Sequence, residues 1–171
     1  MQITREHTAP IPQLGRYQIE PASSAVRFAT RHMFGLAPVR GTFAVRAGTV
    51  DVTGPLTASR ISADIDAASF RTGNAQRDAS VRSARFLDAD QYPAISFSST
   101  GVSGHMLAGT VTVRDVTRPV DLLVELSDVS ARSFTARATV RIDRTEFGVT
   151  AQRGLAGRYL DLSVEARCVR S

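Results

Sequence analysis

The chain alternates apolar and polar residues with a period of two along seven stretches, and little of it has the spacing of a helix. In residues 133–142, every second residue from Phe134 to Ile142 is apolar, and the residues between them are serine, threonine or arginine. Because successive side chains of a strand point to opposite faces, one face of this segment is apolar and the other is polar. The same pattern runs through residues 39–46, 61–66, 95–98, 107–114, 120–126 and 160–168.

Such strands must bury their apolar faces in one interior, either the core of a sandwich or the inside of a barrel, and a barrel can hold a ligand. Residues 17–19 and 26–30 add two shorter strands, and glycine or proline marks hairpin turns at residues 53–55 and 103–105. A length of 171 residues suits a single domain. We therefore expect an all-β domain over residues 15–171, preceded by a flexible tail over residues 1–14.

One region in the middle of the chain departs from this alternation. Residues 72–74, Thr-Gly-Asn, predict a turn that caps a helix, and residues 75–86 then predict a short helix anchored by Val81 and Phe86. Residues 88–93 lead back into a strand. An all-β chain typically uses such an excursion as a lid or a flank of the barrel.

The positive charge of the chain comes from arginine alone. The formal net charge is +5, and the sequence contains no lysine. A general bias of the composition toward arginine is the simpler interpretation. Selection for phosphate contact is the alternative, because a guanidinium group can donate two hydrogen bonds to one phosphate. The arginines are scattered over the polar faces of strands, with no aromatic residues interleaved to stack on bases. We therefore do not expect nucleic-acid binding.

No group of residues has the spacing of a catalytic or metal site. The histidines His7, His32 and His105 are not spaced as zinc ligands, and the carboxylates Asp64 and Asp66 fall on the outward face of a strand. The chain has neither a glycine-rich phosphate loop nor a Gly-x-Ser-x-Gly turn. A triad of distant Ser, His and Asp stays open. Because no charged residue falls on the inward face of the clear strands, we expect a binding protein without cofactor or metal, and not an enzyme.

The remaining signals concern redox chemistry and location. The single cysteine, Cys168, falls on the apolar face of its strand, which predicts a small core residue and not a reactive thiol. Residues 1–14 lack the apolar core of a secretory signal, and no stretch approaches the roughly 20 apolar residues of a membrane span. We expect a cytoplasmic protein with no membrane span.

The central excursion, residues 72–93, carries a series of spaced motifs. They are Thr72-Gly73-Asn74, Arg77-Asp78, Val81-Arg82-Ser83, Phe86-Leu87-Asp88 and Tyr92-Pro93. Further motifs are Tyr17 to Pro21, Val26-Arg27-Phe28, Val39 to Phe43, Val116 to Val120, and Ile142-Asp143-Arg144 followed by Phe147-Gly148. With these motifs, the chain resembles the YceI-like family of lipocalin-like polyisoprenoid-binding proteins over about residues 15–169.

The resemblance implies an extended, antiparallel, eight-stranded, lipocalin-like β-barrel with one short helix and a long loop in the middle of the chain. It also implies an apolar channel that binds a polyisoprenoid, an isoprenoid quinone or a similar long-chain lipid, for carriage, storage or a stress response. The inward residues expected to line this channel are Phe28, Phe43, Val45, Ile61, Ile65, Ile95, Phe97, Leu107, Val111, Leu122, Val124, Phe134, Val140, Leu162 and Val164. Strand parity alone does not separate ligand contacts from core packing.

We expect a polar or phosphate head group to meet His32, Arg77 and Arg82, of which Arg82 fits best because guanidinium binds phosphate with two donors. The structural alternative has His32 bonded to nearby backbone, and the arginines paired with Asp78 or Asp88 to fasten the helix.

The sequence departs from the family pattern at Ser23, Arg71 and Arg85, which shifts the flank toward positive charge. Many members of the family are exported, whereas this sequence shows no leader. Edge strands of such barrels can pair, so a homodimer is compatible with the sequence. Two alternative functions stay open: a closed barrel without ligand that serves structure or interaction, and an enzyme acting on a small apolar substrate.

Overall fold

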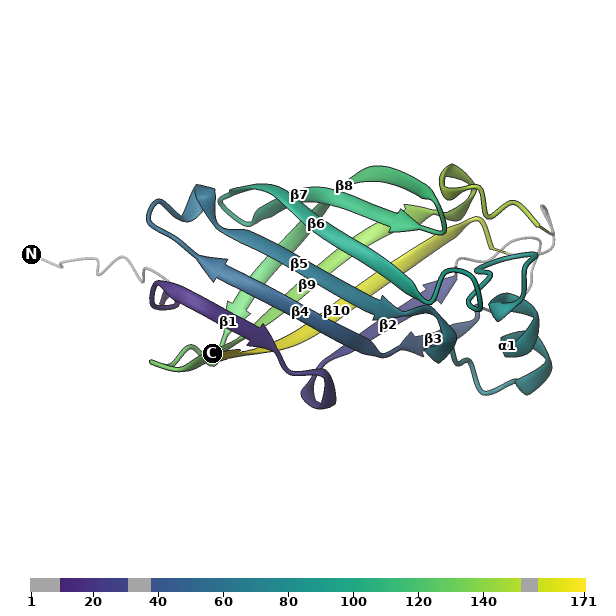
Figure 1. Ribbon diagram of the computed structural model, residues 1–171, viewed down its shortest axis with the longest axis horizontal. Helices are drawn as coiled ribbons and strands as arrows, with labels where there is room; N and C mark the ends of the chain where they lie inside the picture. Colours follow the sequence, from purple (N-terminus) through teal and green to yellow (C-terminus); the bar gives the residue numbers. More distant parts are fainter. Residues whose placement is uncertain (1–9, 31–37, 152–156) are drawn as a thin grey trace, which may run out of the picture.

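A computed structural model of the chain describes residues 10–30, 38–151 and 157–171. It is built almost entirely of strands, with α1 (Ala75–Arg82) at one end of the molecule (Figure 1). The strands are β1 (Gly15–Ile19), β2 (Ala25–Thr30), β3 (Arg40–Phe43), β4 (Val45–Val52), β5 (Arg60–Asp66), β6 (Ala94–Ser103), β7 (Met106–Val113), β8 (Val116–Ser127), β9 (Ser133–Asp143) and β10 (Tyr159–Arg170). Short 3-10 helices are η1 (Pro21–Ser23), η2 (Leu56–Ala58), η3 (Ala67–Ser69) and η4 (Arg144–Phe147).

The strands close into a barrel. Their order is β1-β4-β5-β6-β7-β8-β9-β10, and β1 also pairs with β10, so the first and last strands of this series meet. Every pairing is antiparallel. β1 and β2 pair with successive parts of β10 and are separated by η1, so they share one position in the barrel. β3 and β4 share the next position in the same way. Ten strands therefore occupy eight positions, which confirms the predicted eight-stranded antiparallel barrel.

The structure corrects the prediction of one continuous strand over residues 39–46. Ala44 separates β3 from β4 because its N–H donates to the hydroxyl of Ser69 at 2.7 Å and its carbonyl accepts from the N–H of Asp66 at 3.0 Å. A register shift then follows between Val45 and Ala47. Such a bulge changes which residues face inward, so Val45 and Val50 are both buried although they are five positions apart, a step that would put them on opposite faces of a regular strand.

An apolar cluster closes the part of the barrel formed by β1 and the C-terminal half of β10. It contains Tyr17, Ile19, Val26, Val45, Val50, Val52, Phe134, Ala166 and Cys168. The ring of Tyr17 meets that of Phe134 edge to face at 4.9 Å, and the Tyr17 hydroxyl donates to the carbonyl of Gln13, within the predicted tail. Burial raises the pKa of the Cys168 thiol to about 12, as expected for a core residue.

A second cluster lies between the central excursion and the barrel. Phe86, Phe147 and Val149 are its buried members, and Val81 and Ile142 pack against them. Asn74 caps α1 as predicted, because its side-chain oxygen accepts from the N–H of Arg77 at 2.9 Å. The helix ends at Arg82, earlier than the predicted residue 86, because Ser83 is extended and its hydroxyl bonds the carbonyl of Ser80. Phe86 is therefore held by the turns that follow the helix.

A buried carboxylate fastens α1 to the chain before it. Asp78 is 4% exposed and accepts the N–H of Thr72 at 3.0 Å and its hydroxyl at 2.5 Å. Burial alone would raise the pKa of Asp78, but the hydrogen bonds from Thr72 and the nearby arginines outweigh it, and the pKa lies below its usual value. The ionised carboxylate is therefore the form that stabilises this region.

We predict that Asp78→Asn lowers the melting temperature at neutral pH, because the amide loses one of the two acceptor oxygens. A carboxyl whose folded-state pKa is depressed stabilises the fold above its unfolded-state pKa, and this contribution is lost as pH falls through the folded-state pKa. The difference from wild type should therefore shrink below about pH 4. Melting curves across pH measure it, with the exposed Asp90→Asn as control. A difference that is constant down to pH 2 would contradict this role for Asp78.

Gly41 allows close packing of the aromatic residues between β2, β3 and the segment after η3. A Cβ at Gly41 would lie 2.5 Å from the carbonyl oxygen of Arg71 and closer still to the ring of Phe28, which stacks on Phe70 at 5.1 Å. We predict that Gly41→Ala lowers the free energy of unfolding by about 1–3 kcal/mol through overpacking. Gly101→Ala, whose Cβ would meet nothing within 4 Å, is the matched control and should change it by less than about 0.5 kcal/mol. Equal losses in chemical denaturation would contradict the packing argument.

Candidate functional site

The inner wall of the barrel is apolar and incompletely covered. All fifteen predicted channel residues lie on strands of the barrel, and cross-strand register places them in shared rows such as Phe28, Leu162 and Val140. Only Phe28, Val45, Leu107 and Phe134 are fully buried; the other eleven are partly exposed. Side chains on the inner face of a closed barrel can be reached only from its lumen or through a gap in its wall. Six of the eleven pack against the two apolar clusters of the core, and the remaining five are partly exposed without belonging to either cluster: Ile95, Phe97, Leu122, Val124 and Val140.

The wall of the barrel opens between β8 and β9. The ladder between them runs only from Leu123 opposite Thr139 to Ser127 opposite Thr135. Before Leu123, β8 pairs with β7 alone, although β9 continues to Asp143. A cavity of about 300 Å³ occupies this place, lined by Pro119, Val120, Asp121, Val140, Arg141, Ile142, Asp143, Glu146 and Phe147.

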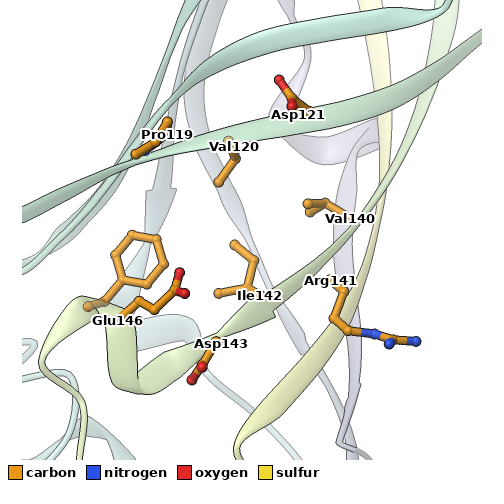
Figure 2. Close-up of a pocket in the computed structure, with 9 residues that line it drawn as sticks. Pro119, Val120, Asp121, Val140, Arg141, Ile142, Asp143 and Glu146 are labelled. Atoms are coloured by element: carbon orange, nitrogen blue, oxygen red, sulfur yellow. The ribbon is translucent and has the colours of Figure 1, made fainter.

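This side opening has an apolar inner part and a charged outer rim. Figure 2 shows Val120, Val140 and Ile142 pointing into the space between the two strands, while Asp121 and Arg141 point away from it. Val140 belongs to the predicted channel residues, so the opening and the lumen share a wall. Pro119 has no N–H to donate to a neighbouring strand. Its position is therefore consistent with the end of strand pairing at this place.

The segment after β9 shapes one side of the opening. Arg144 is buried, and its guanidinium donates to the carbonyls of Gly157 and Val149, each at 2.8 Å, and of Ala151 at 2.9 Å. Its charge also lies over the ring of Phe86, 5.7 Å from the centroid. Arg144 is the first residue of η4 and therefore ties η4 to the segment that follows it, with Phe147 at the opening.

Asp143 fixes the start of η4. Burial by itself would raise the pKa of Asp143, but hydrogen bonds from the N–H and hydroxyl of Thr145 and the guanidinium of Arg158, at 2.9 Å, hold the pKa below its usual value. The motif at residues 142–148 thus builds the wall beside the opening. The sequence of this motif alone does not show this structural role.

Arg118 is a charged residue on the inner face of the barrel, just outside the alternating stretch at residues 120–126 in which the sequence predicts none. β8 begins at Val116, four residues before the alternation at residues 120–126, and Arg118 lies opposite Val111. Val111 and Leu122 are inward, so Arg118 falls on the same face of β8. Arg118 is exposed and precedes Pro119 at the opening. Pro119, the residue after Arg118, breaks the alternation of apolar and polar residues. The sequence pattern therefore does not place Arg118 on the inner face.

The predicted head-group residues have different surroundings. His32 lies outside the described residues. Arg77 donates its Nε to the hydroxyl of Thr72 at 2.9 Å, and Arg82 donates Nε and Nη2 to the carbonyl of Phe70. Both guanidinium groups thus fasten α1, through Thr72 and Phe70 and not by hydrogen bonds to Asp78 or Asp88. Their contact with a head group stays a prediction.

Within the described ranges, no group of three or more His, Cys, Asp or Glu side chains is arranged to hold a metal ion. No helix in this part of the chain is long and apolar enough to cross a membrane.

Comparisons with known proteins agree with this architecture. A UPF0312 protein of Serratia proteamaculans is 28% identical over 159 residues, covering 85% of this chain and 81% of the relative. A UPF0312 protein of Enterobacter sp. (strain 638) is 30% identical over 158 residues, covering 85% and 80%.

Two solved structures share the fold. A polyisoprenoid-binding domain from Saccharophagus degradans, implicated in plant cell wall breakdown, has a TM-score of 0.75 at 13% identity and covers 93% of this chain and 100% of its own. BcnA of Burkholderia cenocepacia has a TM-score of 0.71 at 20% identity and covers 90% and 99%. The sequence profile of the YceI-like domain matches residues 17–168, and the chain therefore belongs to the YceI-like family.

Proposed function

We propose that this protein binds a polyisoprenoid or a similar long-chain amphiphilic lipid in its barrel and carries or stores it, in isoprenoid or quinone metabolism or in a stress response. The observation that carries the proposal is the apolar inner wall, on which eleven side chains are partly exposed. The Saccharophagus degradans domain, which is described as polyisoprenoid-binding, supports this choice of ligand through its shared fold.

The lumen suits a slender chain. A barrel of eight strands leaves an interior just wide enough for side chains or one small ligand. Removing a prenyl chain from water contributes roughly 25 cal/mol per Å² of apolar surface, and this burial needs no directed chemistry. Such binding is consistent with a wall made of isoleucine, valine, leucine and phenylalanine.

The charged residue at the opening fits the head group of an amphiphile. Arg118 lies on the inner face beside the opening, next to the apolar Val120. An apolar tail in the lumen would leave its head near this guanidinium, which binds carboxylate or phosphate well. Among the described residues of the inner wall we find no acid and base placed together, and this favours carriage over catalysis. Cytoplasmic location and homodimer formation stay predictions.

We predict that Leu122→Arg weakens binding of a dansyl-labelled prenyl alcohol at least tenfold, because it puts a charge inside the lumen. Leu123→Arg is the matched control: Leu123 is the next residue of β8, faces outward and is 50% exposed. A tenfold change corresponds to about 1.4 kcal/mol. Fluorescence titration of both variants, with melting curves to verify folding, gives the comparison. Equal affinities in the two folded variants would rule out the lumen as the binding site.

We also predict that the lipid reaches the lumen between β8 and β9. If the existing register continued, Asp121 would lie opposite Arg141, so Asp121→Cys with Arg141→Cys would allow a disulfide or a short bis-maleimide link to close the opening. The control pair, Leu123→Cys with Thr139→Cys, links residues that already lie opposite each other. The native Cys168 is buried and will not interfere.

Closing the opening should slow uptake of the labelled prenyl alcohol at least tenfold, and reduction of the disulfide should restore it. The control link should leave the rate unchanged. Uptake at the wild-type rate through a closed Asp121–Arg141 pair would show that the lipid enters elsewhere.

A further inference from the structure

The outer face of β2 and β3 gathers arginines that pair with no acidic residue in the described part of the chain. Arg27 lies on β2, Arg40 on β3 and Arg71 on the segment after η3, and all three are exposed. Within the described ranges, no hydrogen bond or ion pair occupies any of their guanidinium groups. This contrasts with other outward arginines of the barrel, such as Arg16 and Arg137, which pair with Asp51 and Glu165.

The strand register places these three side chains around one point. Arg27 lies opposite Ser163 on one side and Thr42 on the other, and Thr42 in turn forms a bridge to Arg71. The neighbouring row runs from Asp161 through Ala29 to Arg40. Rows on one face lie roughly 7 Å apart and neighbouring strands about 4.8 Å apart, so the three arginines surround Ala29 and Thr42 within reach of their long side chains.

A hollow of about 490 Å³ lies at this point. Its lining comprises Arg27, Phe28, Ala29, Arg40, Gly41, Thr42, Arg71, Thr72, Asp161 and Ser163. Ala29 and Gly41 are small, so the floor is low between the longer side chains around it. β2 and β3 lie beside each other toward the end of the barrel that carries α1 (Figure 1).

The charge at this hollow is positive and incompletely balanced. Asp161 is the one carboxylate of the lining, and it already pairs with Arg141 at 3.0 Å. Three guanidinium groups around one hollow repel each other, and a bound anion would remove that repulsion. The hydroxyls of Thr42 and Ser163 line the same hollow and can donate as well.

We propose that this hollow, formed by Arg27, Arg40 and Arg71, is a binding site for a phosphate group, either of a free phosphate or diphosphate or of a phospholipid head. Guanidinium presents a planar pair of donors that matches phosphate oxygens, and several arginines can bind one phosphate together. The site lies on the outer wall, so it is separate from lipid binding in the lumen.

The test compares two triple variants that lose the same charge. Arg27→Gln, Arg40→Gln and Arg71→Gln together remove the proposed site. Arg46→Gln, Arg85→Gln and Arg132→Gln remove three exposed arginines from elsewhere. Binding of inorganic diphosphate is measured by calorimetry at low salt, and binding to vesicles of phosphatidylcholine with or without phosphatidylglycerol by sedimentation. Melting curves verify that both variants fold.

We expect at least a tenfold loss of affinity in the first triple variant and less than a twofold loss in the control. Saturable binding of diphosphate alone would identify a free phosphate compound as the ligand. Arginine-dependent binding to phosphatidylglycerol vesicles alone would identify a lipid head group. Equal losses in both triple variants would show a mere effect of net charge and overturn the proposal. No binding of the wild type to either probe would also overturn it.

Discussion

Closure of the sheet, through the pairing of β1 and β2 with β10, is the constraint on which the other features of this structure depend. A closed eight-stranded sheet removes its own edges and fixes the width of its lumen. All inward side chains must then share a narrow space. Around β1 and the end of β10 they fill it, with Tyr17 and Cys168 fully buried, whereas along β5 to β9 most of them remain partly exposed.

Closure of the described sheet is incomplete between β8 and β9. Pro119 lies where pairing between β8 and β9 has ended, and Arg144 holds the following segment in place through three carbonyls. The central excursion covers one end of the barrel with Phe86 and Val81, so the opening in the side wall leads toward the lumen beside that cover. Apolar inner wall, side opening and nearby Arg118 together form an arrangement suited to a long amphiphile.

The alternation of apolar and polar residues predicted most of the strands, because it reports on local backbone geometry, whereas the barrel was implied by the resemblance to the YceI-like family. Asn74 as a cap and Cys168 as a core residue follow from the same local rules. The break at Ala44 depends on contacts with Asp66 and Ser69, which are distant in sequence. Arg118 on the inner face, and the arginines around Ala29, follow from strand register, which a single sequence does not specify.

The most direct test of lipid carriage is mass spectrometry of a solvent extract from freshly purified protein. We predict a long-chain prenyl species near one per chain in the wild type and its absence from a folded Leu122→Arg, Val124→Arg variant. An extract without such a species, from protein that also takes up no added prenyl lipid, would contradict lipid binding in the lumen and would favour a closed barrel that serves structure or interaction.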